Sequence, residues 1–389
     1  YGDHRDLHLS IRRQRQMCIR DSNNIICEQK LNYMKSVIVL GTRPEIIKLA
    51  PIIKKLGTKK HAVIFTGQHY DYQMGMQFIH QLGLPKPNYS LKISKSSPQF
   101  QISEIIAKLS KILTKEKPDT VIVQGDTNTV LAAGICSLKS NIPISHVEAG
   151  LRSNDWRMPE EHNRIAIDHL SELLFTPTRN SKANLVSEKV HGQIHVTGNT
   201  IIDAINTYSR ISKNKSQLSV EIDNFALLTL HRSENVDNRK VLTSIVKGLV
   251  NSNEDIIFPV HPRTRKRLDE FNLYKKLSKS KNILLLDSLG YFEMLELMKK
   301  CTFIVTDSGG IQEEATSPII RKKVLVVRKT TDRPEAIDSG MAEIIGLNEK
   351  IISKSIKNTM KDPRVFSRKT PYGKGDASSK IIKILQRYF

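Results

Sequence analysis

The sequence predicts an α/β protein built from two doubly wound parallel-sheet domains that face each other across a cleft. Short apolar runs of strand length alternate with amphipathic helical segments from residue 34 onward, a pattern typical of parallel sheets covered by helices. A polar segment at residues 206–224 reads as a linker and divides the series into two similar halves. A chain of 389 residues is also too long for one ordinary hydrophobic core.

The first half, residues 34–205, begins with a buried strand at 37–40, a turn at 41–44 and a helix at 45–56. Pro44 suits the first turn of that helix. The same alternation predicts further strands at 61–65, 119–123, 142–147 and 173–176, and helices at 103–113, 129–138 and 160–170.

The second half, residues 206–370, repeats this scheme. We predict strands at 226–230, 256–260, 283–286, 303–306 and 324–327, and helices at 241–250, 292–299 and from 310 onward. Residues 1–33 show no sustained period, and Met34 directly precedes a clean strand. We therefore interpret 1–33 as a non-native or disordered extension and leave it out of the fold.

Composition and charge exclude several classes of protein. The net charge is +22, but the lysines are spread along the chain without a nucleic-acid-binding module, so we expect no nucleic-acid partner. No apolar run approaches the ~20 residues of a membrane helix. The four cysteines lack zinc-site spacing, and Cys136 and Cys301 lie in apolar surroundings. We expect buried thiols, no metal and a reducing, cytoplasmic location.

Polar residues follow the first strand, where a cleft between such domains would lie. The turn Gly41-Thr-Arg-Pro-Glu45 is not the glycine fingerprint of dinucleotide-binding proteins, so no nicotinamide or flavin cofactor is expected. Arg43 and Lys48 instead offer cations at the start of a helix, which suits a phosphate. The alternative is that both are solvated surface residues.

Acidic residues converge on the same cleft. Asp126 and Glu148 each directly follow a buried strand, and Glu160 and Glu161 open a helix. Because acids at helix starts often only complement the helix dipole, we interpret Glu161 in that way. Asp126 and Glu148 have no such explanation and are candidate acid–base groups.

The second half contributes residues suited to a nucleotide. His231 follows the strand 226–230, and the run Asp307-Ser-Gly-Gly310 follows the strand 303–306 and opens a helix. Such a turn presents backbone N–H groups to an anion without a side chain in the way. Glu313 and Glu314 on the next turn could meet a sugar diol.

Eight motifs together resemble those of the non-hydrolysing UDP-N-acetylglucosamine 2-epimerases. They occur in that family's order and cover residues 34 to about 380. They are Gly41-Thr-Arg-Pro-Glu-Ile-Ile-Lys48, Gln124-Gly-Asp-Thr-Asn-Thr129, His146-Val-Glu-Ala-Gly-Leu-Arg152, Met158-Pro-Glu-Glu161, Thr197-Gly-Asn-Thr200, His231-Arg232, Asp307-Ser-Gly-Gly-Ile-Gln-Glu-Glu314 and Arg333-Pro-Glu335.

The resemblance implies a glycosyltransferase-B-like fold of two Rossmann-like domains, with a C-terminal helix in residues 371–389 that crosses back to the first domain. It implies a homodimer without cofactor that interconverts UDP-N-acetylglucosamine and UDP-N-acetylmannosamine, the latter a precursor of surface polysaccharides. UDP leaves by anti elimination, a 2-acetamidoglucal stays bound, and UDP adds back after reprotonation of C2 on the other face.

The resemblance also implies roles for individual residues. Asp126, Glu148 and Glu160 would be the acid–base carboxylates, with the face of C2 that each serves left open, and His231 would lie beside the phosphates. The substrate-binding residues would be Arg43, Lys48, Ser308, Gly309 and Gly310 at the phosphates, Glu314 at the ribose and Arg333 on the nucleotide side. Met294 stands where the family often places an aromatic ring near the uracil, and a thioether can still contact a ring.

Four rival functions remain open at this point. A relative of the same fold could epimerise another UDP-sugar, such as a diacetamido uronic acid. A hydrolysing epimerase would release free N-acetylmannosamine. A glycosyltransferase of the same fold would need an acceptor site and would have no use for three acidic residues. A basic RNA-binding protein would show steeply salt-dependent RNA affinity and no response to UDP.

Overall fold

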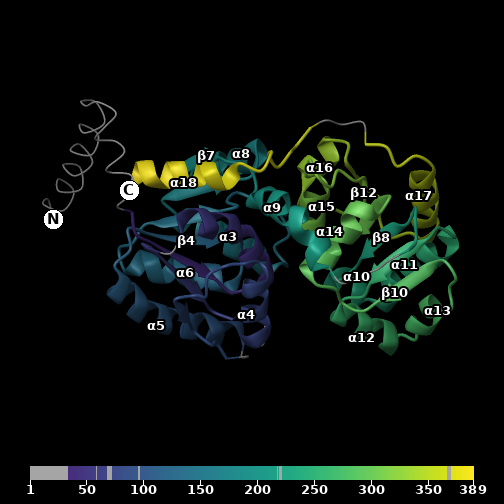
Figure 1. The fold of residues 1–389 in the computed structure, drawn as a ribbon, viewed down its shortest axis with the longest axis horizontal. Helices are drawn as coiled ribbons and strands as arrows, with labels where there is room; N and C mark the ends of the chain where they lie inside the picture. Colours follow the sequence, from purple (N-terminus) through teal and green to yellow (C-terminus); the bar gives the residue numbers. More distant parts are fainter. Residues whose placement is uncertain are drawn as a thin grey trace, which may run out of the picture.

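The computed structural model describes residues 34–389 except 58, 68–71, 95–96, 217, 219–220 and 366–368, so the prediction for residues 1–33 lies outside the described part. Two parallel sheets lie side by side (Figure 1). The first has the order β3-β2-β1-β4-β5-β6-β7 and the second β10-β9-β8-β11-β12-β13. This confirms the predicted fold class of two doubly wound α/β domains.

The strands are short, as expected for buried parallel sheets. In the first domain they are β1 (Ser36–Leu40), β2 (His61–Phe65), β3 (Tyr89–Ser90), β4 (Thr120–Gln124), β5 (Ile144–Val147), β6 (Leu173–Thr176) and β7 (Gln193–Val196). In the second they are β8 (Ala226–Thr229), β9 (Ile256–Pro259), β10 (Ile283–Leu286), β11 (Phe303–Thr306), β12 (Val324–Val326) and β13 (Ala342–Ile344).

Helices cover both faces of each sheet. Those of the first half are α3 (Arg43–Leu56), α4 (Tyr72–Gln81), α5 (Pro98–Glu116), α6 (Asn128–Lys139), α7 (Pro159–Leu170), α8 (Arg179–Ser187) and α9 (Thr200–Lys215). Those that follow are α10 (Ser233–Val236), α11 (Arg239–Ser252), α12 (Pro262–Glu270), α13 (Tyr274–Ser278), α14 (Tyr291–Lys300), α15 (Gly309–Ala315), α16 (Pro334–Asp338), α17 (Glu349–Lys361) and α18 (Ala377–Tyr388).

Side chains of β1 alternate between two hydrophobic clusters. Val37 and Val39 belong to the cluster on the α5 and α6 side, and Ile38 and Leu40 to the larger cluster that includes α3 and α9. Because successive strand residues point to opposite faces, both faces of this strand must be apolar. The apolar run from Val37 to Leu40 in β1 therefore follows from its central place in the sheet.

The predicted linker at residues 206–224 is wrong for its first part, because α9 continues to Lys215. The segment is polar in composition, yet Tyr208, Ser209 and Ser212 are buried. Tyr208 Oη donates to the Leu82 carbonyl at 3.2 Å, and the hydroxyl of Ser212 bonds the carboxylate of Glu296. Since α9 packs against α3 in one domain and α14 in the other, it forms part of the wall between the domains.

The C-terminal helix α18 lies along the first domain, against α3 and α9 (Figure 1). Asp203 on α9 fixes its start, since its carboxylate accepts from the backbone N–H of Ala377 at 3.1 Å and of Ser378 at 2.9 Å. The chain thus leaves the second domain after α17 and ends on the first.

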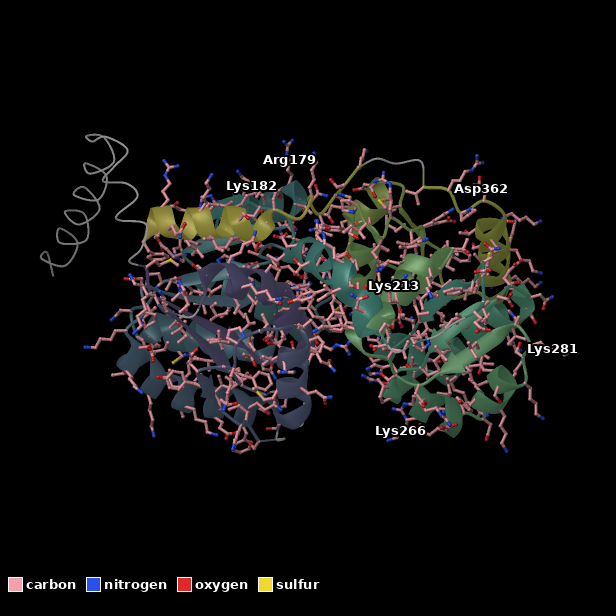
Figure 2. All side chains as sticks on the ribbon, viewed as in Figure 1. Arg179, Lys182, Lys213, Lys266, Lys281 and Asp362 are labelled. Carbon is pink, nitrogen blue, oxygen red and sulfur yellow. The ribbon has the colours of Figure 1, made fainter. Side chains whose placement is uncertain are left out.

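Charged side chains project from the surface over both domains, with Lys182 labelled on the first and Lys266 and Lys281 on the second (Figure 2). The positive charge is therefore spread rather than gathered into one stripe. Cys136 and Cys301 are buried and free of disulfides, as predicted. Among the described residues, none of the helices has the length and apolar character needed to cross a bilayer.

Candidate active site

A cavity of about 1300 Å³ lies between the domains, beyond the carboxyl ends of strands from both sheets. This is where a doubly wound fold is expected to bind ligand. Eleven of the twelve residues predicted to form the site line it: Arg43, Lys48, Asp126, Glu148, Glu160, His231, Met294, Ser308, Gly310, Glu314 and Arg333. Gly309 is buried just behind the surface, where a Cβ atom would come within 3.2 Å of the Asp332 carboxylate.

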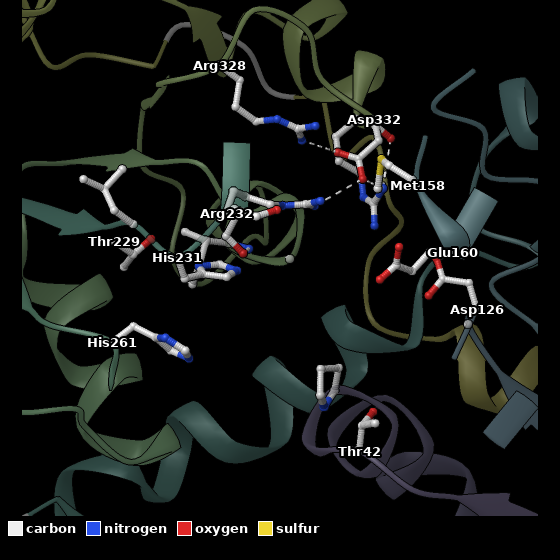
Figure 3. Close-up of a pocket in the computed structure, with 18 of the residues that line it drawn as sticks. Thr42, Asp126, Met158, Glu160, Thr229, His231, Arg232, His261, Arg328 and Asp332 are labelled. Atoms are coloured by element: carbon white, nitrogen blue, oxygen red, sulfur yellow. Dashed lines mark hydrogen bonds and ion pairs between the residues drawn. The ribbon is translucent and has the colours of Figure 1, made fainter. Parts of the chain in front are cut away.

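Asp126 and Glu160 point into the cavity from the first domain, opposite His231 and Arg232 of the second (Figure 3). Asp126 follows Gly125, whose φ of 83° turns the chain at the end of β4. Its carboxylate accepts from Arg164 Nε at 3.1 Å and also pairs with Nη2 of the same guanidinium. Glu160 is exposed on the first turn of α7. The two carboxylates therefore differ: Arg164 holds that of Asp126 in place, whereas that of Glu160 is solvated.

Glu148 occupies a left-handed backbone conformation, with a φ of 71°. A non-glycine residue adopts this region at a cost of about 1–3 kcal/mol, and such residues cluster at functional sites. Burial raises the pKa of its carboxyl, while the ammonium of Lys48 opposes that shift. Glu148 Oε2 lies 2.5 Å from Lys48 Nζ and accepts from Gln124 Nε2 at 3.1 Å.

Lys48, predicted at the phosphates, and Arg333, predicted on the nucleotide side, line the cavity and both contact carboxylates. Lys48 Nζ also lies 3.2 Å from Glu313 Oε2. Arg333 Nε donates to Glu313 Oε1 at 2.5 Å, and its Nη2 lies 3.6 Å from Glu148 Oε1. Two cations and two carboxylates thus form a buried network across the domain boundary. Sequence reasoning missed it because these charges come from four separate motifs.

The opposite wall is organised by the buried carboxylate of Asp307. It accepts from the backbone N–H of His231 at 3.1 Å and of Arg232 at 3.0 Å, and from Asn235 Nδ2 at 3.2 Å. Burial lowers the pKa of His231, with Asp307 acting in the opposite sense. The imidazole is therefore held at the cavity wall by its own backbone.

Glu313 and Glu314 separate into different environments. Glu313 is fully buried in the ion network, whereas Glu314 lines the cavity. Burial raises the pKa of Glu314 to about 7, and the nearby cations Lys48 and Arg43 oppose this. Arg43 lines the cavity, and its guanidinium lies 4.9 Å from the centroid of the Phe78 ring.

Glu161, the second acidic residue at the start of α7, binds the preceding loop and Arg164. Glu161 is buried and accepts from the backbone N–H of Ser153 and Asn154 and from Arg164 Nη1 at 2.8 Å. Glu161 therefore orders the loop before α7, close to the structural role expected for it. Arg164 lines the cavity and was missed, because an arginine inside a helix carries no motif of its own.

Glu45 is a second residue that the sequence did not single out. Its carboxylate accepts from the N–H groups of Gly41 at 2.5 Å and Thr42 at 3.1 Å, and from Thr127 Oγ1 at 2.5 Å. It thereby joins the turn after β1 to the turn after β4. Burial raises the pKa of Glu45 to about 7, from an ordinary value of 4.5.

The raised pKa of Glu45 predicts a pH-dependent stability. A carboxyl whose folded-state pKa lies above its unfolded value stabilises most below pH 4.5, and that contribution is lost as the pH rises through about 7. We expect Glu45→Gln, which cannot ionise, to lose less stability than the wild type between pH 5 and 8. Urea denaturation midpoints of both proteins, measured across this pH range, test the prediction. If the midpoint changes equally with pH in the wild type and in Glu45→Gln, the prediction is contradicted. Glu314 also has a raised pKa, so the stability of Glu45→Gln should still decrease somewhat with rising pH.

Comparisons with known proteins, by sequence and by structure, all point to the same family. A model of the UDP-N-acetylglucosamine 2-epimerase family matches residues 53–386. The UDP-N-acetylglucosamine 2-epimerase of Methanocaldococcus jannaschii is 44% identical over 365 residues, 90% of this chain and 99% of that protein. The crystal structure of the enzyme from that organism in complex with UDP-GlcNAc and UDP superposes with a TM-score of 0.80 at 42% identity, over 90% of this chain and 99% of the other.

A relative of different named specificity is also similar. The UDP-2,3-diacetamido-2,3-dideoxy-D-glucuronate 2-epimerase of Pseudomonas aeruginosa is 34% identical over 363 residues, which cover 91% of this chain and all of that protein. The family match, the long alignments and the shared two-domain fold agree with the motifs in the cleft. The chain belongs to the UDP-N-acetylglucosamine 2-epimerase family.

Proposed function

We propose that this protein is a non-hydrolysing UDP-N-acetylglucosamine 2-epimerase that interconverts UDP-N-acetylglucosamine and UDP-N-acetylmannosamine. The observation that carries the proposal is the arrangement of the cleft. The carboxylates of Asp126, Glu148 and Glu160 lie on the first domain, and His231 and Ser308 lie on the second, around one cavity. The carboxylates could then face the sugar carbon that exchanges a proton, while His231 and Ser308 face the departing diphosphate.

The chemistry assigns different work to the two walls. The C2 hydrogen of the sugar is weakly acidic, so its removal must accompany the departure of UDP from C1. Carboxylates of the first domain would take and return the proton. His231 and the backbone N–H groups near Ser308, together with Arg43 at the start of α3 on the first domain, would stabilise the growing negative charge of the diphosphate. UDP stays bound and adds back after C2 is reprotonated on its other face.

Lys48 takes a role other than the one expected from the sequence. Its ammonium contacts Glu148 and Glu313 at 2.5 and 3.2 Å. These contacts support a function in which Lys48 orients Glu148 and favours its ionised form. Arg43 would then bind the diphosphate. Burial raises the pKa of Glu148, and a close cation opposes this by favouring the ionised form that a base requires.

The charges of the cleft favour a neutral sugar over a uronic acid. Within the part of the chain that the structure describes, the cations that contact Asp126 and Glu148 also have other acidic partners: Arg164 pairs with Asp126 and Glu161, and Lys48 and Arg333 with Glu148 and Glu313. A sugar carboxylate would need a further cation there. This supports UDP-N-acetylglucosamine as the substrate to test first.

Proton NMR of the protein with UDP-N-acetylglucosamine in deuterated water tests the proposal. We expect an anomeric signal of UDP-N-acetylmannosamine to grow, with deuterium entering C2. Free N-acetylmannosamine and UDP would instead indicate a hydrolysing enzyme. Turnover of the diacetamido uronic acid nucleotide alone would contradict the proposed sugar.

His231→Ala tests the phosphate wall. Loss of one hydrogen-bonding group at the diphosphate should weaken UDP binding about tenfold, equivalent to ~1.4 kcal/mol. Isothermal titration calorimetry with UDP measures this directly. An unchanged dissociation constant would restrict His231 to a structural role.

A further inference from the structure

A line of buried polar groups runs beneath the first-domain wall of the cleft and is not used by the proposed chemistry. It joins Asp168 on α7, His146 on β5 and the carbonyl of Gly125 after β4. His146 Nδ1 lies 2.8 Å from Asp168 Oδ1, and His146 Nε2 lies 2.9 Å from the Gly125 oxygen. Both side chains are at most 1% exposed, so solvent does not supply alternative partners.

Asp168 also binds the chain on the far side of Glu148. Its Oδ2 accepts from the backbone N–H of Gly150 at 3.1 Å and lies 2.8 Å from Arg152 Nη1. One carboxylate therefore holds residues 146, 150 and 152, which flank the left-handed Glu148 on both sides. An unfavourable backbone conformation persists only where its surroundings over-determine it. Asp168 supplies that restraint.

His146 extends the restraint to the other carboxylate. A carbonyl oxygen only accepts hydrogen bonds, so His146 Nε2 donates to Gly125, the residue directly before Asp126. An ionised carboxylate also only accepts, so Nδ1 donates to Asp168 and the ring carries a proton on each nitrogen. Arg152 also pairs with Glu188. The cluster then holds two positive groups, His146 and Arg152, and two negative groups, Asp168 and Glu188. That balance suits a buried site.

We propose that Asp168 and His146 are positioning residues that fix Asp126 and Glu148 relative to each other. The inference rests on the proposed function, in which both carboxylates act on one sugar carbon. They come from the neighbouring strands β4 and β5, and the Asp168–His146 pair ties the turns after both strands together. A shift of ~1 Å in a reacting group can lower a rate by about a hundredfold.

Asp168→Asn and His146→Gln test the proposal. Asparagine keeps the size of Asp168 but places an amide NH₂ against donors, and glutamine can donate to only one of the two acceptors of His146. We expect kcat for UDP-N-acetylglucosamine to fall about 30- to 100-fold in each, with KM and UDP affinity within about threefold of wild type. His61→Gln is the matched control, because His61 bonds Ser36 in the same sheet at 2.8 Å. It should leave kcat unchanged.

A spectroscopic measurement on the wild-type protein tests the hydrogen bonds of His146 directly. Histidine ring ¹⁵N–¹H spectra, with His146 assigned by the signal missing in His146→Gln, should show an N–H on both ring nitrogens. A single N–H, or kcat within about threefold of wild type in both variants, would overturn the proposal. So would a parallel loss of kcat, UDP affinity and melting temperature, which indicates general unfolding. Absence of wild-type turnover of UDP-N-acetylglucosamine would instead contradict the proposed function, and the inference would fall with it.

Discussion

Asp126→Asn should lower kcat for epimerisation about a thousandfold while leaving the fold intact. Asparagine has the same shape but cannot take up a proton, and general acid–base groups contribute ~10²- to 10⁴-fold to a rate. Asp126 faces the cavity and its carboxylate is held by Arg164, so the substitution should change the chemistry of the group and not its place. The NMR assay with UDP-N-acetylglucosamine in deuterated water measures turnover and C2 exchange together.

Asp155→Asn provides a control for this experiment. Asp155 lines the same cavity, but its carboxylate pairs with the exposed Arg157. Its neutralisation should change kcat less than about twofold. If Asp126→Asn also turns over at nearly the wild-type rate, the acid–base role belongs to Glu148 and Glu160 alone.

The fold was largely predictable because central strands such as β1, β4 and β11 each contain a short apolar run. β1, β4 and β11 were placed to within one residue, since only a buried parallel strand needs both faces apolar. Helix α9 was not predicted, and its second half was assigned to a linker, because Ser209 and Ser212 look solvated in sequence. In the structure the Ser212 hydroxyl bonds the buried Glu296, a partner 84 positions away. The two-residue β3 is too short to give a periodic signal.

The composition of the candidate site was more predictable than its contacts. Motifs after strand ends identified the residues that line the cavity, because parallel strands bring their carboxyl ends to one edge. They did not reveal that Lys48 contacts Glu148, 100 positions away, nor that His146 contacts Asp168. These contacts join side chains of the first domain that come from elements far apart in the sequence, and no local pattern encodes such pairings.

The pairing of Lys48 leads to the prediction with the largest expected effect on stability. Lys48→Met would remove one of the two cations, Lys48 and Arg333, that the buried carboxylates of Glu148 and Glu313 share. Breaking a buried ion pair by removing one partner costs about 3–5 kcal/mol, because an uncompensated charge remains in a poorly solvated place. Urea denaturation should show this loss, and UDP affinity should change little if Lys48 does not touch the diphosphate.

The double variant Lys48→Met, Glu313→Gln separates the two possible roles of Lys48. Neutralising Glu313 removes part of the repulsion, so the double variant should recover stability relative to Lys48→Met alone, a coupling that independent sites would not show. Arg333 would still face Glu148 from the second domain, 3.6 Å away. If stability is instead unchanged in Lys48→Met while UDP binding falls more than tenfold, Lys48 is a phosphate ligand after all. The network then opens when nucleotide enters the cleft.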